Sequence, residues 1–167
     1  MADTLPKDRL LPALLDRLTD DNPGQPEARR DRAYSMRDFR KMILRDLTAL
    51  LNANSPPAFE GFDEYPLVAR SVVNYGMPEL AGITASTVAP AELERIVREA
   101  IRAFEPRVIP ATLSVRAVEA ADGTAGNVIR LEIRGEVFAE PVPEALYVKT
   151  EIDLESGQCR LREEAGG

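Results

Sequence analysis

The chain has 167 residues, of which 44% are hydrophobic and 29% are charged, and 21 basic against 28 acidic residues give a formal net charge of −7. This composition is typical of one soluble globular domain, and the acidic balance disfavours a dedicated nucleic-acid-binding protein. There is no histidine and Cys159 is the single cysteine. These counts exclude Ser-His and Cys-His nucleophile pairs, histidine-bearing or thiolate-rich metal sites, and an internal disulfide framework. The N-terminal residues lack the apolar stretch of a secretory signal and no apolar run reaches a membrane-spanning length, so we expect a cytoplasmic protein without direct membrane insertion.

The N-terminal part of the chain predicts a short helix on a tether. Leu14, Leu15 and Leu18 follow helical spacing, and the residues at 20–26 break the helix. This helix is expected either to pack on its own domain or to dock on a partner. In the segment 27–37, acids are interleaved with arginines and no aromatic series accompanies them, which favours a solvated linker over a phosphate-binding segment.

Three further helices are predicted before the chain changes to strands. The first covers 35–52, with Ser35 as its N-cap and an apolar face interrupted only at Asp46. The second is expected over 65–74, with apolar side chains available for burial. The third covers 90–105 and is strongly amphipathic, with proline at its first turn.

After residue 106 the apolar period changes from about 3.6 to 2. Strands are predicted over 113–118, 129–137 and 146–154, and a turn at 155–157 leads to a short last strand around 159–161. Each strand has one apolar face. The outer face of the sheet is therefore expected to be charged, with edges that carry no obvious caps.

This order predicts an α+β fold: about three helices packed on one face of a three- to four-stranded, mainly antiparallel sheet, preceded by a tethered short N-terminal helix. We expect residues 1–34 to form the N-terminal helix and flexible linker, 35–162 to form the α+β domain, and 163–167 to form a disordered tail.

The helix–strand corner is the most distinctive local feature of the sequence. Pro106 lacks an N–H and disfavours helical geometry at the residue before it, so the third long helix should end near Glu105. Glu105 and Arg107 then flank the proline with opposite charges. They are expected either to form a salt bridge within the chain or to face a protein partner.

Catalytic chemistry has little support in the sequence. No glycine-rich phosphate loop is present, and no cluster of metal ligands stands out, so no cofactor, metal or catalytic residue is assigned. A pair of carboxylates can hydrolyse a glycosidic bond, and Glu105 has the most unusual position among the acids. Its partner would be Glu64, Glu79 or Asp153, but in a chain with 28 acids such a pair has almost no specificity.

Several stretches, taken in their order along the chain, carry a resemblance to a known family. They are Leu14–Asp20, Leu44–Leu47, Leu50–Asn52, Tyr65–Pro66, Arg70–Gly76, Pro78–Leu80, Glu105–Arg107 and Thr150–Asp153. Together they resemble TssE, the baseplate component of bacterial type VI secretion systems, in a family shared with a "lysozyme-like" wedge protein of contractile-tail phage baseplates. Asn-Tyr-Gly at 74–76 and Glu-Pro-Arg at 105–107 are the core of the resemblance, and the segment 27–37 does not map onto it.

The resemblance implies a structural subunit of the baseplate wedge, and not an enzyme. It implies assembly with TssF, TssG and TssK, a role in starting the TssB/TssC sheath by strand addition at an open sheet edge, and a location at the baseplate on the inner face of the cytoplasmic membrane. The implied partner-binding residues are Glu105, Pro106 and Arg107, together with Leu14, Leu15 and Leu18 of the N-terminal helix. The alternatives are a peptidoglycan-cleaving, lysozyme-like hydrolase and a regulatory adaptor that binds one soluble partner.

Overall fold

The structure of the chain is a computed structural model. It describes residues 13–19, 23–24, 35–56, 64–69, 71–80, 89–118, 128–139 and 142–163. Most of the arginine-containing segment 27–37 and the C-terminal residues 164–167 lie outside this part.

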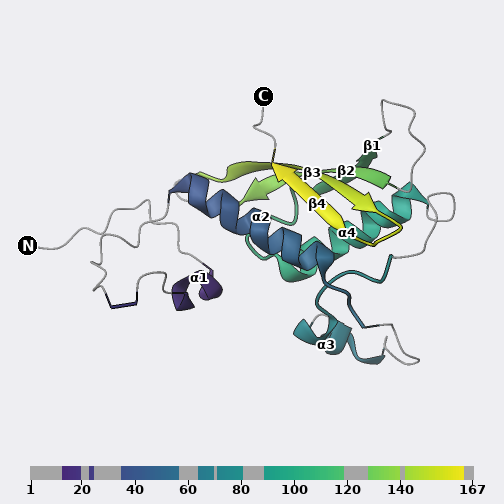
Figure 1. Ribbon diagram of the computed structural model, residues 1–167, viewed down its shortest axis with the longest axis horizontal. Helices are drawn as coiled ribbons and strands as arrows, with labels where there is room; N and C mark the ends of the chain where they lie inside the picture. The colour runs from purple at the N-terminus through teal and green to yellow at the C-terminus, as the bar shows by residue number, and fades with distance from the viewer. Residues whose placement is uncertain are drawn as a thin grey trace, which may run out of the picture.

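A four-stranded antiparallel sheet forms one layer of the fold (Figure 1). The strands are β1 Ser114–Val118, β2 Val128–Val137, β3 Glu144–Asp153 and β4 Cys159–Glu163. Their order in the sheet is β1-β2-β3-β4, so every strand pairs with its neighbour in the sequence. The edges in this part of the chain are therefore β1 and β4. Glu163, expected in the tail, is the last residue of β4.

Two long helices, α2 Met36–Asn52 and α4 Pro90–Phe104, cover one face of this sheet (Figure 1). The predicted N-cap of α2 is present, because the Asp38 N–H donates to Ser35 Oγ at 3.2 Å. Pro90 begins α4, where its missing N–H needs no partner. These elements confirm the predicted α+β class.

The core lies between the helical layer and the inner face of the sheet. Most of its members come from the apolar stripe of a helix or from alternate strand positions, as the periods of 3.6 and 2 require, and a few, such as Met77, Val108 and Leu154, come from connecting segments. The largest fully buried side chains include Ile43, Leu47, Leu50, Leu93, Ile101, Leu131, Ile133, Ile152 and Leu154.

The helix predicted over 65–74 is wrong in its extent and in its burial. The structure instead has a single turn, α3 Pro66–Ala69, followed by a 3-10 turn, η2 Val72–Asn74. Ser71 separates them because its backbone is extended and its hydroxyl accepts the Val73 N–H. Leu67 and Val72, expected to be buried, are more than 80% exposed.

The chain after η2 returns to the core through a tight backbone contact. Asn54 and Met77 form a parallel bridge, and the Met77 N–H donates to the Ala53 carbonyl at 2.8 Å. Gly76 makes this contact possible: its φ is +119°, and a Cβ there would lie 2.4 Å from the Ala53 carbonyl oxygen.

Candidate protein-docking site at the helix–strand corner

The corner that follows α4 is fixed to the sheet by backbone hydrogen bonds. The Glu105 N–H closes the helix on the Ile101 carbonyl, and the Val108 N–H donates to the Glu105 carbonyl across Pro106. On the sheet side, the Phe138 N–H donates to the Arg107 carbonyl at 2.8 Å. The side chains at 105–107 therefore stand on a rigid support.

Glu105 and Arg107 pair with each other, so the salt bridge within the chain is the interpretation that the geometry supports. Glu105 is 4% exposed, and its Oε1 accepts both the Arg107 backbone N–H at 3.1 Å and Nε at 2.7 Å. Arg107 Nη2 donates to Oε2, which makes the side-chain pair bidentate. Glu105 is thus a positioning residue beneath the surface. Pro106 is exposed, and the Arg107 side chain is 20% exposed.

Arg107 also reaches across to α2. Its Nη2 lies 2.7 Å from Asp46 Oδ2, and Asp46 Oδ1 in turn pairs with Arg45 at 2.7 Å. Arg45 then binds Asp16 of α1 Leu14–Leu18. Three carboxylates and two guanidinium groups therefore alternate from the corner to α1. We call this set, Glu105–Arg107–Asp46–Arg45–Asp16, the corner network.

The pKa values of Arg107 and Asp16 are both shifted by their charged neighbours in the corner network. Burial by itself lowers the pKa of Arg107, but hydrogen bonds and charge from Glu105 and Asp46 outweigh it, and the pKa is raised. The hydrogen bond from Arg45 is the largest cause that holds the pKa of Asp16 below its ordinary value. Both pKa shifts favour the charged forms, a guanidinium at Arg107 and a carboxylate at Asp16. One donor stays unsatisfied: Arg107 Nη1 is buried without a hydrogen-bond partner among the described residues.

The leucines of α1 are largely exposed. Asp16 turns toward α2, whereas Leu14, Leu15 and Leu18 are between 61% and 74% exposed. A hollow of about 500 Å³ lies beside the helix. It is lined by Ala13, Leu14, Asp46, Leu50, Tyr75, Phe104, Glu105, Pro106 and Arg107. The structure thus brings Leu14 together with the predicted corner residues, while Leu15 and Leu18 do not line this hollow.

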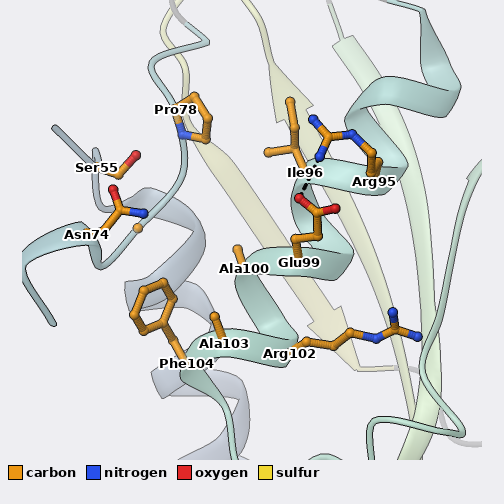
Figure 2. Close-up of a pocket in the computed structure, with 11 residues that line it drawn as sticks. Ser55, Asn74, Pro78, Arg95, Ile96, Glu99, Ala100, Arg102, Ala103 and Phe104 are labelled. Carbon is orange, nitrogen blue, oxygen red and sulfur yellow. Dashed lines mark hydrogen bonds and ion pairs between the residues drawn. The ribbon is translucent and has the colours of Figure 1, made fainter. Parts of the chain in front are cut away.

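A second hollow of about 760 Å³ lies on the other side of Phe104, between α4 and the loop after η2 (Figure 2). Ile96, Ala100 and Phe104 face it from α4, and Asn74 and Pro78 lie opposite. Phe104 lines both hollows, and its ring meets Tyr75 edge-on at 5.4 Å between centroids. Phe104 thus gives both hollows an apolar side, and Tyr75 extends it in the hollow beside α1.

Sequence reasoning missed Asp46, Arg45, Asp16 and Tyr75 as parts of the site. A signal existed for Asp46, because it is the single interruption of the apolar face of α2. Its ion pair with Arg107 explains why a carboxylate is tolerated there.

No group of three or more His, Cys, Asp or Glu side chains suited to holding a metal ion occurs in the described ranges. Within the same ranges, none of the helices has the length and apolar character needed to cross a membrane.

A family model described as "Baseplate wedge protein gp25" matches residues 37–142, from the first turn of α2 to the connection before β3. The match includes α4 and the corner at 105–107. No curated protein and no solved structure gives a significant match. Since the family model covers more than half of the chain, this protein belongs to the family of baseplate wedge protein gp25, which is also the family of TssE.

Proposed function

We propose that this protein is the TssE-type wedge subunit of a type VI secretion baseplate. In this role it binds TssF and TssG, assembles with TssK, and helps to start the TssB/TssC sheath at the cytoplasmic side of the inner membrane. Family membership supports a structural role in a baseplate. The finer assignment to named partners rests on the resemblance of the ordered motifs and on the geometry of the corner.

The observation that carries the proposal is the corner network. In this network the buried carboxylate of Glu105 holds Arg107 in place. Arg45 binds Asp16 and so attaches α1, a short helix whose leucines are exposed. Exposed leucines next to a hollow with an aromatic side and a charged side are an arrangement that a partner protein can bury.

The surroundings of the acids support a role without catalysis. A lysozyme-like general acid needs an apolar pocket that keeps it protonated near neutral pH. Glu105 instead faces a guanidinium at hydrogen-bond distance. Asp153 accepts the Glu155 and Ser156 N–H groups in a turn, and these hydrogen bonds lower its pKa.

The sheet edges bear on how a sheath strand would be added. At β4, the Asn52 side chain binds both backbone groups of Cys159. Asn52 Nδ2 donates to the Cys159 carbonyl, and the Cys159 N–H donates to Asn52 Oδ1, each at 2.9 Å. The backbone N–H and C=O of Cys159 therefore point away from β3. Because these groups alternate in direction along an antiparallel strand, those of Leu161 and Glu163 also point away from β3. At β1, Glu94 accepts the Ala117 N–H, and Arg98 donates to the Val115 carbonyl. We place the added strand along β4 beyond Asn52, because no such cap is found there among the described residues.

The first test is co-purification of the tagged protein with co-expressed TssF and TssG. The variants are wild type, a triple variant with Leu14, Leu15 and Leu18 changed to serine, and Arg107→Ala. We expect a stable wild-type complex that weakens in the triple variant, whose exposed leucines add little to the fold. Arg37→Ala, an exposed position on α2 away from the corner, is the matched control. A wild type that stays alone would overturn the wedge assignment, and release of sugar from peptidoglycan by the wild type would favour the hydrolase.

The edge is tested separately with Glu163→Pro. A proline there removes an N–H that faces away from β3, so the ladder with β3 is kept. We expect the variant to fold and to bind TssF and TssG, but to start sheaths poorly when TssB and TssC are added. Normal sheath formation in electron micrographs would reject β4 as the receiving edge. Glu163→Ala, which removes the side chain and its 3.7 Å contact to Arg40 but keeps the backbone N–H, controls for the lost side chain.

A further inference from the structure

The outer face of the sheet, on the side away from α2 and α4, is basic although the chain is acidic. Register places side chains of the four strands in rows across this face. The three central rows are Val118-Arg130-Glu151-Arg160, Arg116-Glu132-Lys149-Arg162 and Ser114-Arg134-Tyr147. They contain six basic side chains and two acidic ones. The flanking rows Val128-Asp153 and Glu136-Ala145 add two more acids, so the face is net positive in a chain of net charge −7. We call the three central rows the basic sheet face.

The two acids of the basic sheet face are already engaged. Glu151 Oε1 lies 3.1 Å from Arg130 Nε, and Glu132 accepts from Arg134 and from the Tyr147 hydroxyl, each at 2.8 Å. In contrast, Arg116, Arg160 and Arg162 are exposed and form no ion pair within the described ranges. Asp153, on the same face of β3, interacts electrostatically with Arg160, so the uncompensated positive charge lies mainly at Arg116 on β1 and Arg162 on β4.

The basic sheet face is also fixed in shape and poor in apolar surface. The Arg134 guanidinium stacks over the Tyr147 ring at 4.7 Å, and the Lys149 ammonium lies 5.9 Å from the same centroid. Val118 is its one exposed large aliphatic side chain. Recognition at this face must therefore come mainly from charge, presented as a fixed pattern by four paired strands.

We propose that the basic sheet face docks the acidic face of another protein in the assembled baseplate. A folded partner can place carboxylates over Arg116 and Arg162 and avoid Glu132 and Glu151, which a uniform polyanion cannot do. Nucleic acid fits less well, because its binders are net basic and this chain is not. An anionic membrane fits less well too, because the face offers almost no apolar side chain for insertion. This inference rests on the proposed wedge function.

One lysine makes a direct test possible. The chain has three lysines, Lys7, Lys41 and Lys149, and Lys149 is the one on the basic sheet face. A zero-length carbodiimide cross-linker joins a lysine amine to a carboxylate with loss of water, so it reports an acidic partner in contact. The complex assembled from the co-expressed wedge and sheath proteins is cross-linked, and the linked peptides are read by mass spectrometry.

We expect partner carboxylates linked to Lys149 and few linked to Lys41, which is exposed on α2. Lys149→Arg should remove the link and keep the assembly, because the charge is kept. The double variant Arg116→Glu/Arg162→Glu should weaken partner binding by about tenfold or more at low salt, with a smaller difference at high salt. The matched control, Arg37→Glu/Lys41→Glu, changes net charge equally on α2 and should bind like wild type.

The other outcomes contradict the inference in distinguishable ways. A complex that forms normally, without Lys149 links and without loss in Arg116→Glu/Arg162→Glu, overturns the basic sheet face as a docking surface and leaves the wedge function intact. Binding of the free protein to a DNA duplex or to phosphatidylserine vesicles through these arginines assigns the face to another anion. A wild type that does not assemble at all overturns both proposals.

Discussion

Arg107 Nη2 meets Asp46 Oδ2 at 2.7 Å, although the two residues are 61 positions apart in the chain. This contact joins the corner after α4 to the middle of α2. The buried Glu105 carboxylate pairs with the same Arg107 side chain. Any change at one of the three groups therefore alters the electrostatic surroundings of the other two, but by unequal amounts, because their burial differs.

Arg107→Ala should destabilise the protein more than Asp46→Ala does. Removal of Arg107 leaves the buried Glu105 carboxylate without its counter-charge, which costs about 3–5 kcal/mol. Removal of Asp46 leaves the Glu105–Arg107 pair in place, so we expect a loss of about 1–2 kcal/mol. Urea unfolding followed by circular dichroism measures both. Equal losses would show that Glu105 is not held by Arg107 alone, and Arg102→Ala on the exposed side of α4 serves as control.

Asn52→Ala should weaken the attachment of β4 to α2. The Asn52 amide donates to the Cys159 carbonyl and accepts the Cys159 N–H, so alanine leaves two backbone groups unsatisfied. We expect a loss of about 2 kcal/mol in unfolding free energy and faster hydrogen exchange at the Cys159 amide. Asn52→Asp keeps the acceptor and loses the donor, so it should fall between wild type and alanine; a neutral Asn52→Ala would rule out the amide as the cap of this edge.

Gly76→Ala should be far more harmful than Gly24→Ala. Both glycines have φ above +100°, so both substitutions carry a backbone strain of about 1–2 kcal/mol. At Gly24 a Cβ meets nothing within 4 Å, whereas at Gly76 it lies 2.4 Å from the Ala53 carbonyl oxygen. The difference between the two melting temperatures isolates the steric effect. Similar melting temperatures would mean that the Asn54–Met77 bridge moves freely.

Cys159 gives a pH dependence with a defined sign. Burial raises the pKa of its thiol from 9.0 to about 11. The folded state therefore disfavours the thiolate, and the stability that Cys159 contributes is complete below pH 9 and declines as the pH rises toward 11. The decline should reach about 2–3 kcal/mol.

Cys159→Ala has no thiol to ionise. The difference in unfolding free energy between wild type and this variant should therefore shrink between pH 9 and pH 11. Slow reaction of the native thiol with a maleimide at pH 8, and fast reaction in urea, is the companion measurement. A constant gap across this range would mean that the thiol is not buried.

The long elements could be predicted from the sequence because each satisfies a strong period. The stripe of α4 and the alternation in β2 place their apolar residues on one side without ambiguity. The prediction of one helix over 65–74 was wrong because apolar spacing does not tell whether the residues are buried, and Leu67 and Val72 are exposed. A local hydrogen bond at Ser71 then decided the break.

The candidate site could be predicted only in part. Pro106 fixes the end of α4 through covalent geometry, so the corner was visible in the sequence. The ion pair between Arg107 and Asp46 of α2 could not be predicted, because it depends on how two helices pack across the core. The rows of the basic sheet face had the same limit: alternation separates the faces of each strand, but register decides which charges become neighbours.

The Asn52–Cys159 contact has a consequence for synthesis. It spans 107 positions, and β4, the strand that it holds, is made last. While the ribosome is still adding residues near 158, α2 has been complete for about a hundred positions and its buried leucines have no β4 to cover them. The growing chain therefore has to be shielded from premature association until its final strand emerges. A polypeptide that ends before Cys159 would expose apolar residues of α2 that β4 otherwise covers, and would not be a smaller working subunit.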